Sequence, residues 1–234
     1  MPAKICAIHQ PNFFPWLGYF NKIKRCDKFI ILDDVQFPKT GSTWLNHVAI
    51  NIQGQKKWIT APVVRKHGVW SVQETCFLET AWRANIKKTL QMNYAKAGHF
   101  SEIRDFIFTL IDFPSNKLLE YNLNALFKIG ELLQLGFRNK IEMASSFNAN
   151  STATQRLVDI VKASGCAIYL SGGGAGSYQE DDKFASAGIK LVYQDYQPQP
   201  YQQVNADNFI SGLSMIDVLM NCGIESTSKL LSSR

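Results

Sequence analysis

Short apolar segments, each followed by a polar or glycine-containing loop and then by a helical pattern, constrain the fold of this chain most strongly. Residues 4–9 predict a buried strand, and the loop 10–15 leads into a helix over 16–25. Near the C-terminus, predicted strands over 166–170 and 189–193 enclose a glycine loop and a helix through Phe184. This alternation predicts an α/β fold with a mainly parallel sheet flanked by helices.

The rest of the chain is expected to fit the same domain. A second strand is predicted over 28–32, and two more over 46–52 and 57–63 are joined by a turn-rich link. Aliphatic residues at helical spacing predict a helical segment at about 80–136. Helices are also expected over 152–163, with a capping box of Thr152 and Gln155, and over 211–222. A length of 234 residues with 46% hydrophobic content fits a single domain over residues 1–234.

Composition excludes several classes of protein. The five cysteines are scattered without a C-x-x-C pair, which argues against a disulfide framework and against a zinc site. No apolar run approaches the roughly 20 residues of a membrane span, and the first residues do not resemble a secretory signal. We therefore expect a cytoplasmic protein without membrane insertion. The net charge of +6 suits an anionic ligand such as a nucleotide. Its densest basic group is interpreted as a solvated helix face: Lys22, Lys24, Arg25 and Lys28.

The segment 9–20 carries the densest group of candidate site residues. It places a histidine, two amides, two prolines and a glycine between a predicted strand and a predicted helix. Ligands of parallel sheets bind at the carboxyl ends of the strands, and free N–H groups at the helix start after Pro15 could bind an anion. A histidine at a strand end can also be an ordinary core residue. Four residues are taken as candidates here: His9, Gln10, Asn12 and Tyr19.

Two aspartates follow the predicted strand over 28–32. One of Asp33 and Asp34 can form a cap or a turn, and the other can act as a general base or bind a cation. Since the first two strands are expected to be neighbours, an aspartate here could hydrogen-bond His9, orient its ring and raise its basicity. The candidate catalytic residues are therefore His9, Asp33 and Asp34.

Two further loops hold candidate binding residues. Trp44 could stack on a sugar or a base, or could simply pack, and Trp58 is expected in the core. Glycines in the loop 171–177 could let backbone N–H groups approach a phosphate, although the loop matches no phosphate-loop consensus and a plain tight turn is an equal alternative. The four histidines are scattered, so no metal site is predicted. The candidate binding residues of this part of the chain are Gln36, Lys39, Trp44, Asn46, Ser171, Gly172, Gly173 and Gly174.

Several motifs resemble a known family. The longest is H-Q-P-N-F-x-P-W-L-G-Y-F-x-K-I at residues 9–23, and D-D-V-Q-F-x-K with W-x-N follows over 33–46. Further matches are W-I-T-x-P-V (58–63), Y-L-S-G-G-G-A (169–175) and L-S-M-I-D-V-L-M-N-C-G (213–223). On these motifs the chain resembles the WbqC-like protein family. His47 is a departure, because we expect the family to carry arginine there, whose planar fork histidine does not replace.

The resemblance implies a transferase of surface-polysaccharide (O-antigen) biosynthesis. It would attach an aminoacyl or acyl group, glycyl being the first candidate, to the amine of a nucleotide-linked amino sugar. His9 would take the proton of the amine and Asp33 or Asp34 would orient its ring. Three amides are candidates for stabilising the oxyanion: Gln10, Asn12 and Asn46. The substrate would be contacted by Gln36, Lys39 and Trp44, and Lys39 with the glycine loop would hold its phosphates.

Several alternatives stay open at this point. The activated donor could be an aminoacyl-tRNA, a thioester or an adenylate derived from ATP, and no other cofactor is implied. The chain could instead be a non-catalytic sugar-nucleotide-binding or scaffold protein of the same pathway, or an RNA-binding protein. The apolar helical middle could form the face of a homodimer.

Overall fold

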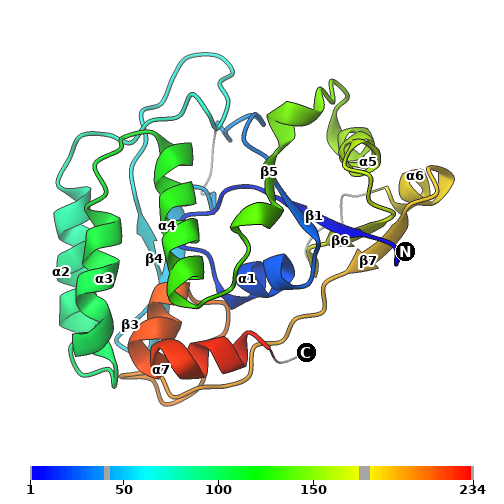
Figure 1. Cartoon of the computed structure of the whole chain (residues 1–234). Coiled ribbons are helices and arrows are strands. Elements are labelled where there is room, and N and C mark those ends of the chain that lie inside the picture. The colour runs from blue at the N-terminus through cyan, green and yellow to red at the C-terminus, as the bar shows by residue number, and fades with distance from the viewer. Residues whose placement is uncertain (1, 40–42, 174–179, 233–234) are drawn as a thin grey trace.

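A five-stranded parallel sheet forms the centre of the computed structural model, which describes residues 2–39, 43–173 and 180–232 (Figure 1). The strand order is β5-β2-β1-β6-β7, and every neighbouring pair is parallel. The strands are β1 (Ile5–His9), β2 (Lys28–Ile31), β5 (Ile141–Met143), β6 (Ile168–Ser171) and β7 (Lys190–Tyr193). The predicted α/β class and the predicted pairing of the first two strands are both confirmed.

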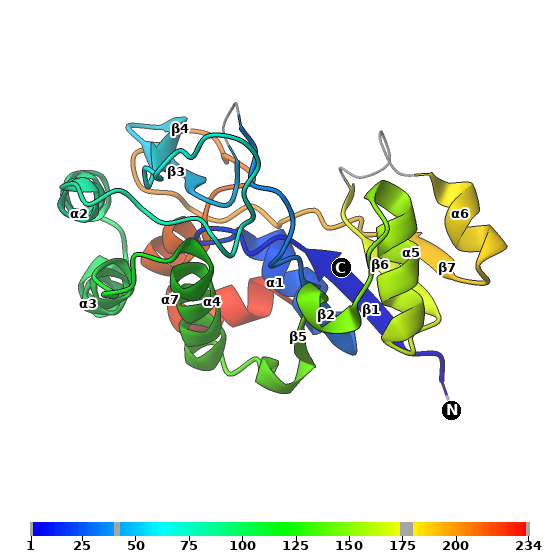
Figure 2. The ribbon, with the colours of Figure 1, turned by 90° about the horizontal axis from the view of Figure 1, so that it is seen from above.

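Helices cover both faces of this sheet (Figure 2). Successive side chains of a strand point to opposite faces, and β1 shows this directly. Cys6 and Ile8 join the apolar cluster of α5 (Ala153–Ala163) and α6 (Asp181–Ser186). Ala7 joins the larger cluster that contains α1 (Leu17–Lys24) and α7 (Met215–Leu230). His9, two residues after Ala7, therefore belongs to the face that α1 covers.

The helical middle of the chain packs beside the sheet together with an antiparallel hairpin (Figure 1). Its helices are α2 (Trp82–Tyr94), α3 (Phe100–Ile111) and α4 (Leu118–Leu132), and the hairpin consists of β3 (His47–Ile52) and β4 (Gln55–Thr60). Helix α7 contacts both the helical middle and the hairpin. Tyr94 of α2 links these two parts and α7 to one another. Its hydroxyl accepts a bond from the Asn51 N–H at 2.9 Å and donates one to Asp217 at 2.7 Å.

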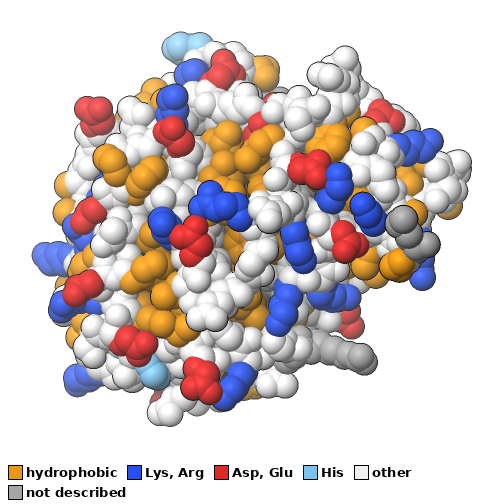
Figure 3. Space-filling view, in the orientation of Figure 1, with side chains coloured by type: hydrophobic (Ala, Val, Ile, Leu, Met, Phe, Trp, Pro, Cys, Tyr) orange, Lys and Arg blue, Asp and Glu red, His pale blue; other side chains and the backbone are white. Residues whose placement is uncertain are grey.

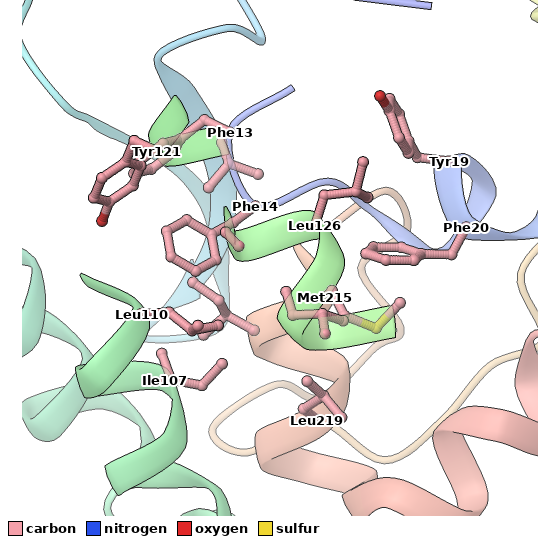
Figure 4. Packing of buried hydrophobic residues seen from close by; sticks show 14 of the residues in the cluster. Phe13, Phe14, Tyr19, Phe20, Ile107, Leu110, Tyr121, Leu126, Met215 and Leu219 are labelled. Atoms are coloured by element: carbon pink, nitrogen blue, oxygen red, sulfur yellow. The ribbon is translucent and has the colours of Figure 1, made fainter. Parts of the chain in front are cut away.

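Aromatic rings from the loop 10–15 connect the sheet to the helical middle. Figure 4 shows Phe13 and Phe14 beside Tyr121 of α4, with Leu110 of α3 below them. The Phe13 and Tyr121 rings stack at 5.9 Å between centroids, and Phe14 meets Tyr121 at 6.3 Å. The loop that follows β1 is therefore anchored in the main core rather than lying on the surface.

The element boundaries differ from the expectations in four places. The three-residue strand β5, between the short 3-10 helices Arg138–Lys140 and Ala144–Phe147, was not predicted. Strand β4 ends at Thr60, and α7 continues past Cys222 across a kink at Gly223 to Leu230. Thr152 does precede α5, but its side chain makes no capping hydrogen bond, and Gln155 bonds Asp159 at 2.8 Å instead of closing the predicted box. No helix in the described ranges has the length and apolar character needed to cross a membrane.

Candidate functional site

A cavity of about 680 Å³ opens at the carboxyl ends of β1 and β6. From β1 the chain proceeds to β2 on one side, while β6 and β7 extend the sheet on the other side, so the strand order reverses between β1 and β6. Such a reversal point is where open parallel sheets bind ligands. The lining of the cavity includes eight of the predicted site residues: His9, Gln10, Asn12, Tyr19, Trp44, Ser171, Gly172 and Gly173.

The loop after β1 is held rigidly along the cavity wall. The amide of Asn122 on α4 donates to the Pro11 and Leu45 carbonyls, both at 2.7 Å. The Ser214 hydroxyl donates to the Phe14 carbonyl at 2.8 Å, which fixes the other end of the loop. Phe14 itself has φ = 40°, a strained conformation for a bulky residue that persists only where its surroundings enforce it. The polar residues of this loop are therefore positioned before any ligand binds.

His9 lies at the end of β1 as a neutral imidazole. Its ring meets Tyr19 at 4.8 Å between centroids, and the Tyr19 hydroxyl donates to the Gln10 carbonyl at 2.9 Å. The same carbonyl lies 3.2 Å from His9 Nδ1. Since a carbonyl only accepts, Nδ1 carries the proton and Nε2 is the unprotonated nitrogen. Burial, together with the charge of Lys22, lowers the pKa of His9 to about 3, so the ring is uncharged at neutral pH.

Lys22 is a cavity residue that the sequence interpretation missed. It was assigned to a solvated helix face, yet only 2% of it is exposed and it lines the cavity. Burial lowers the pKa of its ammonium group to about 8. One signal in the sequence was available: Lys22 follows Tyr19 by three residues, which places both on one face of a helix.

The two predicted catalytic aspartates are used elsewhere. The carboxylate of Asp33 accepts bonds from the Ser145 N–H at 3.0 Å and its hydroxyl at 2.6 Å, and from the Gln73 amide. Asp34 forms an ion pair with Arg156 at 2.6 Å. The expected hydrogen bond from an aspartate to His9 is therefore corrected: the structure places the Gln10 carbonyl at Nδ1, and both carboxylates join their loop to neighbouring segments.

Three other predicted residues lie outside the cavity lining, and one lies outside the described residues. Gln36 is exposed, and its backbone forms an isolated antiparallel β-bridge with Ser71. Lys39 is exposed as well, and its carbonyl accepts a bond from Arg65 at 3.1 Å. Asn46 is buried and donates to the Ala61 carbonyl at 2.9 Å, which is a structural role. Gly174 belongs to the segment that is not described.

Lys56 and a group of aromatic rings complete the wall on the hairpin side. Lys56 lines the cavity and donates to the Ser211 carbonyl at 3.0 Å. Trp44 and Trp58 meet at 4.8 Å between centroids and are 38% and 48% exposed, so the expected core position of Trp58 is wrong. His47 packs against Trp58 at 4.5 Å, and burial lowers its pKa.

No group of three or more histidine, cysteine or acidic side chains in the described ranges is arranged to bind a metal ion.

Comparison with known proteins identifies the family. The profile of the WbqC-like protein family matches residues 10–229. An uncharacterized protein of Mycobacterium tuberculosis (strain ATCC 25618 / H37Rv), Rv1507c, is 30% identical over 230 residues, which cover 97% of each chain. No solved structure matches. These matches show that the chain belongs to the WbqC-like protein family.

Proposed function

We propose that this protein is a cytoplasmic transferase of surface-polysaccharide biosynthesis that attaches an acyl or aminoacyl group to the amine of a nucleotide-linked amino sugar. Glycyl is the first candidate for the transferred group. The observation that supports this best is the convergence in one cavity of a neutral histidine, side-chain amides, an exposed indole and a glycine-containing strand end. Cavities of this size commonly bind small molecules and cofactors.

The reaction requires an amine nitrogen to attack an activated carbonyl carbon. The C–N bond forms, and the bond from carbon to the leaving oxygen or sulfur breaks. A buried amine is more often neutral than a dissolved one, because burial disfavours the charged form. Once the C–N bond has formed, the nitrogen becomes strongly acidic, and its proton passes to His9 Nε2 and from there to the leaving group. A histidine with a pKa near 3 suits this later transfer better than the deprotonation of a free ammonium group.

The geometry changes the roles proposed for the other residues. Gln10 and Asn12 remain candidates for oxyanion stabilisation, because both line the cavity, whereas Asn46 bonds Ala61. Lys22 and Lys56 are cavity cations, and Lys39 is replaced in that role. Three classes of donor fit the same step, because an aminoacyl-tRNA, a thioester and an adenylate each carry a suitable leaving group.

A panel assay tests this function. Purified protein is combined with amino-sugar nucleotides of the uridine and deoxythymidine classes and with each donor class, and acylated sugar is detected by mass spectrometry. Thermal shift on the same panel reports binding, with ATP and bulk tRNA as comparators. We expect saturable stabilisation by an amino-sugar nucleotide and an acylated product. His9→Ala should reduce the rate by roughly 10²–10⁴-fold, while His67→Ala, at an exposed histidine outside the cavity, should leave it unchanged.

Each alternative function predicts a different outcome. A sugar-nucleotide-binding or scaffold protein would be stabilised by the nucleotide without forming product, and His9→Ala would have no catalytic effect. An RNA-binding protein would show a thermal shift with tRNA alone and a steep loss of affinity with salt. On the face shown in Figure 3, Lys and Arg are interspersed with Asp and Glu rather than forming a continuous basic band, which favours the small-molecule reading.

A further inference from the structure

Lys22 differs from the other lysines near it by being buried without a counter-charge. Residues 17–23 of α1 are all buried, and Lys22 is 2% exposed. Lys24, two residues later, is exposed and donates to the Ser232 hydroxyl at 2.6 Å. Within the described residues the Lys22 ammonium group has neither a hydrogen-bond acceptor nor a carboxylate partner. Fully buried lysines are almost always paired, so an unpaired one at a cavity indicates a missing anionic partner.

The surroundings of the ammonium group leave room for that partner. A Cβ atom built on Gly172 would lie 3.1 Å from Lys22 Nζ, so a side chain at this position would crowd the amine. Gly172 and Gly173 directly follow β6 and line the same cavity. Glycine at this place keeps the space beside the ammonium group open and lets the backbone approach a ligand closely.

A second polar group of the same cavity is also unsatisfied. Asn12 is 5% exposed, and its side-chain oxygen is buried with no hydrogen-bond partner in the described residues. The neighbouring Tyr19 hydroxyl and His9 imidazole do not compensate for the charge of Lys22. The Tyr19 hydroxyl bonds the Gln10 carbonyl, and His9 is itself neutral beside Lys22. The cavity thus lacks both an anion for Lys22 and a polar group for Asn12.

We propose that Lys22, with the backbone of Gly172 and Gly173, forms an anion subsite that binds a phosphate group of the ligand, while Asn12 binds a neighbouring polar group. Lysine binds phosphate as a compact point charge and is a common phosphate ligand. The proposal deepens the proposed function, since it places the phosphates of the nucleotide-linked sugar, but phosphate binding can be measured without any acyl transfer. Burial is the larger cause of the low pKa of His9, and an anion at this position would offset the smaller one, the charge of Lys22.

The test compares two lysines of one helix. Binding of uridine 5′-diphosphate, uridine and inorganic pyrophosphate is measured by calorimetry for the wild type, Lys22→Met and Lys24→Met. We expect the wild type to bind the diphosphate more tightly than uridine and to bind pyrophosphate detectably. Lys22→Met should weaken diphosphate binding by at least about tenfold, as loss of a charged hydrogen bond does, and leave uridine binding unchanged. Lys24→Met removes the same charge from the surface and should behave like the wild type.

A second measurement separates a direct contact from a structural effect. Burial holds the pKa of the free Lys22 near 8, and a bound phosphate raises it. Diphosphate binding at pH 8.5 should therefore take up protons, which appear as a dependence of the heat on the ionisation enthalpy of the buffer, and Lys22→Met should abolish that uptake.

Four results would overturn the subsite: equal diphosphate affinity in the wild type and Lys22→Met, an equal loss of diphosphate binding and of uridine binding in Lys22→Met, proton uptake that persists in Lys22→Met, or no binding of either phosphate by the wild type. Phosphate binding with the expected Lys22 dependence, but without acylated product in the panel assay, would leave the subsite standing and contradict only the transferase function.

Discussion

At the scale of single residues, Lys22 shows how this fold maintains an unfavourable charge. The pKa of its ammonium group falls from 10.5 in solution to about 8 in the folded protein, mainly through burial. A shift of that size corresponds to a cost of about 3 kcal/mol for holding the charged form at neutral pH. Stability alone would favour an apolar side chain at this position. A residue that lowers stability in this way is expected where the side chain serves ligand binding.

We therefore expect Lys22→Met to stabilise the empty protein. The substitution removes a buried unpaired charge and retains an unbranched apolar chain, so the free energy of unfolding at pH 7 should rise by about 1–3 kcal/mol. Urea unfolding measures it directly, with Lys24→Met as the control that changes stability by less than about 0.5 kcal/mol.

The pH dependence of that gain has a definite sign. Between pH 8 and 10.5 the unfolded Lys22 still binds a proton that the folded protein has released, so wild-type stability rises with pH in this window. The advantage of Lys22→Met should be full below pH 8 and shrink as the pH rises towards 10.5. A gain that is constant across this range, or a loss of stability, would show that the ammonium group is not desolvated as described.

Sequence patterns locate single residues unevenly. His9 and the glycines after β6 were predicted because a strand end followed by a loop is visible in the sequence, and both line the cavity. Lys22 was not, because a lysine on a short helix is usually solvated and only the packing of α7 and the β6 end over α1 buries it. The aspartates were misplaced for a related reason: Ser145 and Arg156, their partners, come from more than 110 residues away.

At the scale of elements, the hairpin β3–β4 and the turn before it form the aromatic wall of the cavity. Lys56, Trp58 and Thr60 share one face of β4 by its two-residue period, and Lys56 reaches the cavity. Trp44 lines the cavity beside them and packs on Trp58 at 4.8 Å. Exposed indoles next to a lysine are suited to stacking on a nucleobase whose phosphates lie deeper in the site.

We expect Trp44→Ala to weaken uridine and uridine 5′-diphosphate binding alike, because a stacking contact is made by the base. The loss should be about 1–3 kcal/mol, measured by the same calorimetry, and the Trp44→Phe variant should recover much of it. Since Trp44 is 38% exposed, its substitution should change the free energy of unfolding little. Loss of diphosphate binding alone would place the base elsewhere, since that pattern is the one expected for Lys22.

The elements themselves were predictable to differing degrees. Strands β1, β2, β6 and β7 have apolar residues bounded by turn signals, and each lies within about two residues of its predicted bounds. Strand β5 has only three residues, Ile141–Met143, and becomes a strand because it pairs with β2 over Phe29–Ile31. The C-terminal helix was predicted to end at Cys222, and the non-helical Gly223, at φ = 70°, does end the first segment of α7 there. The second segment, which continues to Leu230, was not predicted.

At the scale of the whole molecule, the order of the strands explains why the cavity exists where it does. The chain leaves β1 through α1 towards β2, and the helical middle must be traversed before the sheet resumes on the other side at β6. The two strand ends diverge there, and the loop 10–15 is fixed at this gap by α4 and α7. The site thus depends on segments from the entire chain, which no local pattern in the sequence could specify.

This dependence leads to a prediction for unfolding. The larger apolar cluster includes residues of the sheet, the hairpin, α1, the helical middle and α7. Asp217 on α7, fully buried, accepts bonds from Tyr94 of α2 at 2.7 Å and Tyr201 at 2.7 Å, and so ties the middle of the chain to its end. Separating the helical middle would break this network and expose the shared core, at a large fraction of the total stability.

We therefore predict that residues 1–234 unfold in one cooperative transition. Calorimetric and van't Hoff enthalpies should agree, and tryptophan fluorescence should report the same midpoint as far-ultraviolet circular dichroism. Tyr94→Phe deletes a hydroxyl that serves both Asn51 and Asp217, and should lower the stability by about 1–3 kcal/mol while keeping a single transition. Two resolved transitions, with Tyr94→Phe shifting only one of them, would instead mean that the helical middle is a separate unit that docks on the sheet, and the rigid placement of the loop 10–15 would then have to be reconsidered.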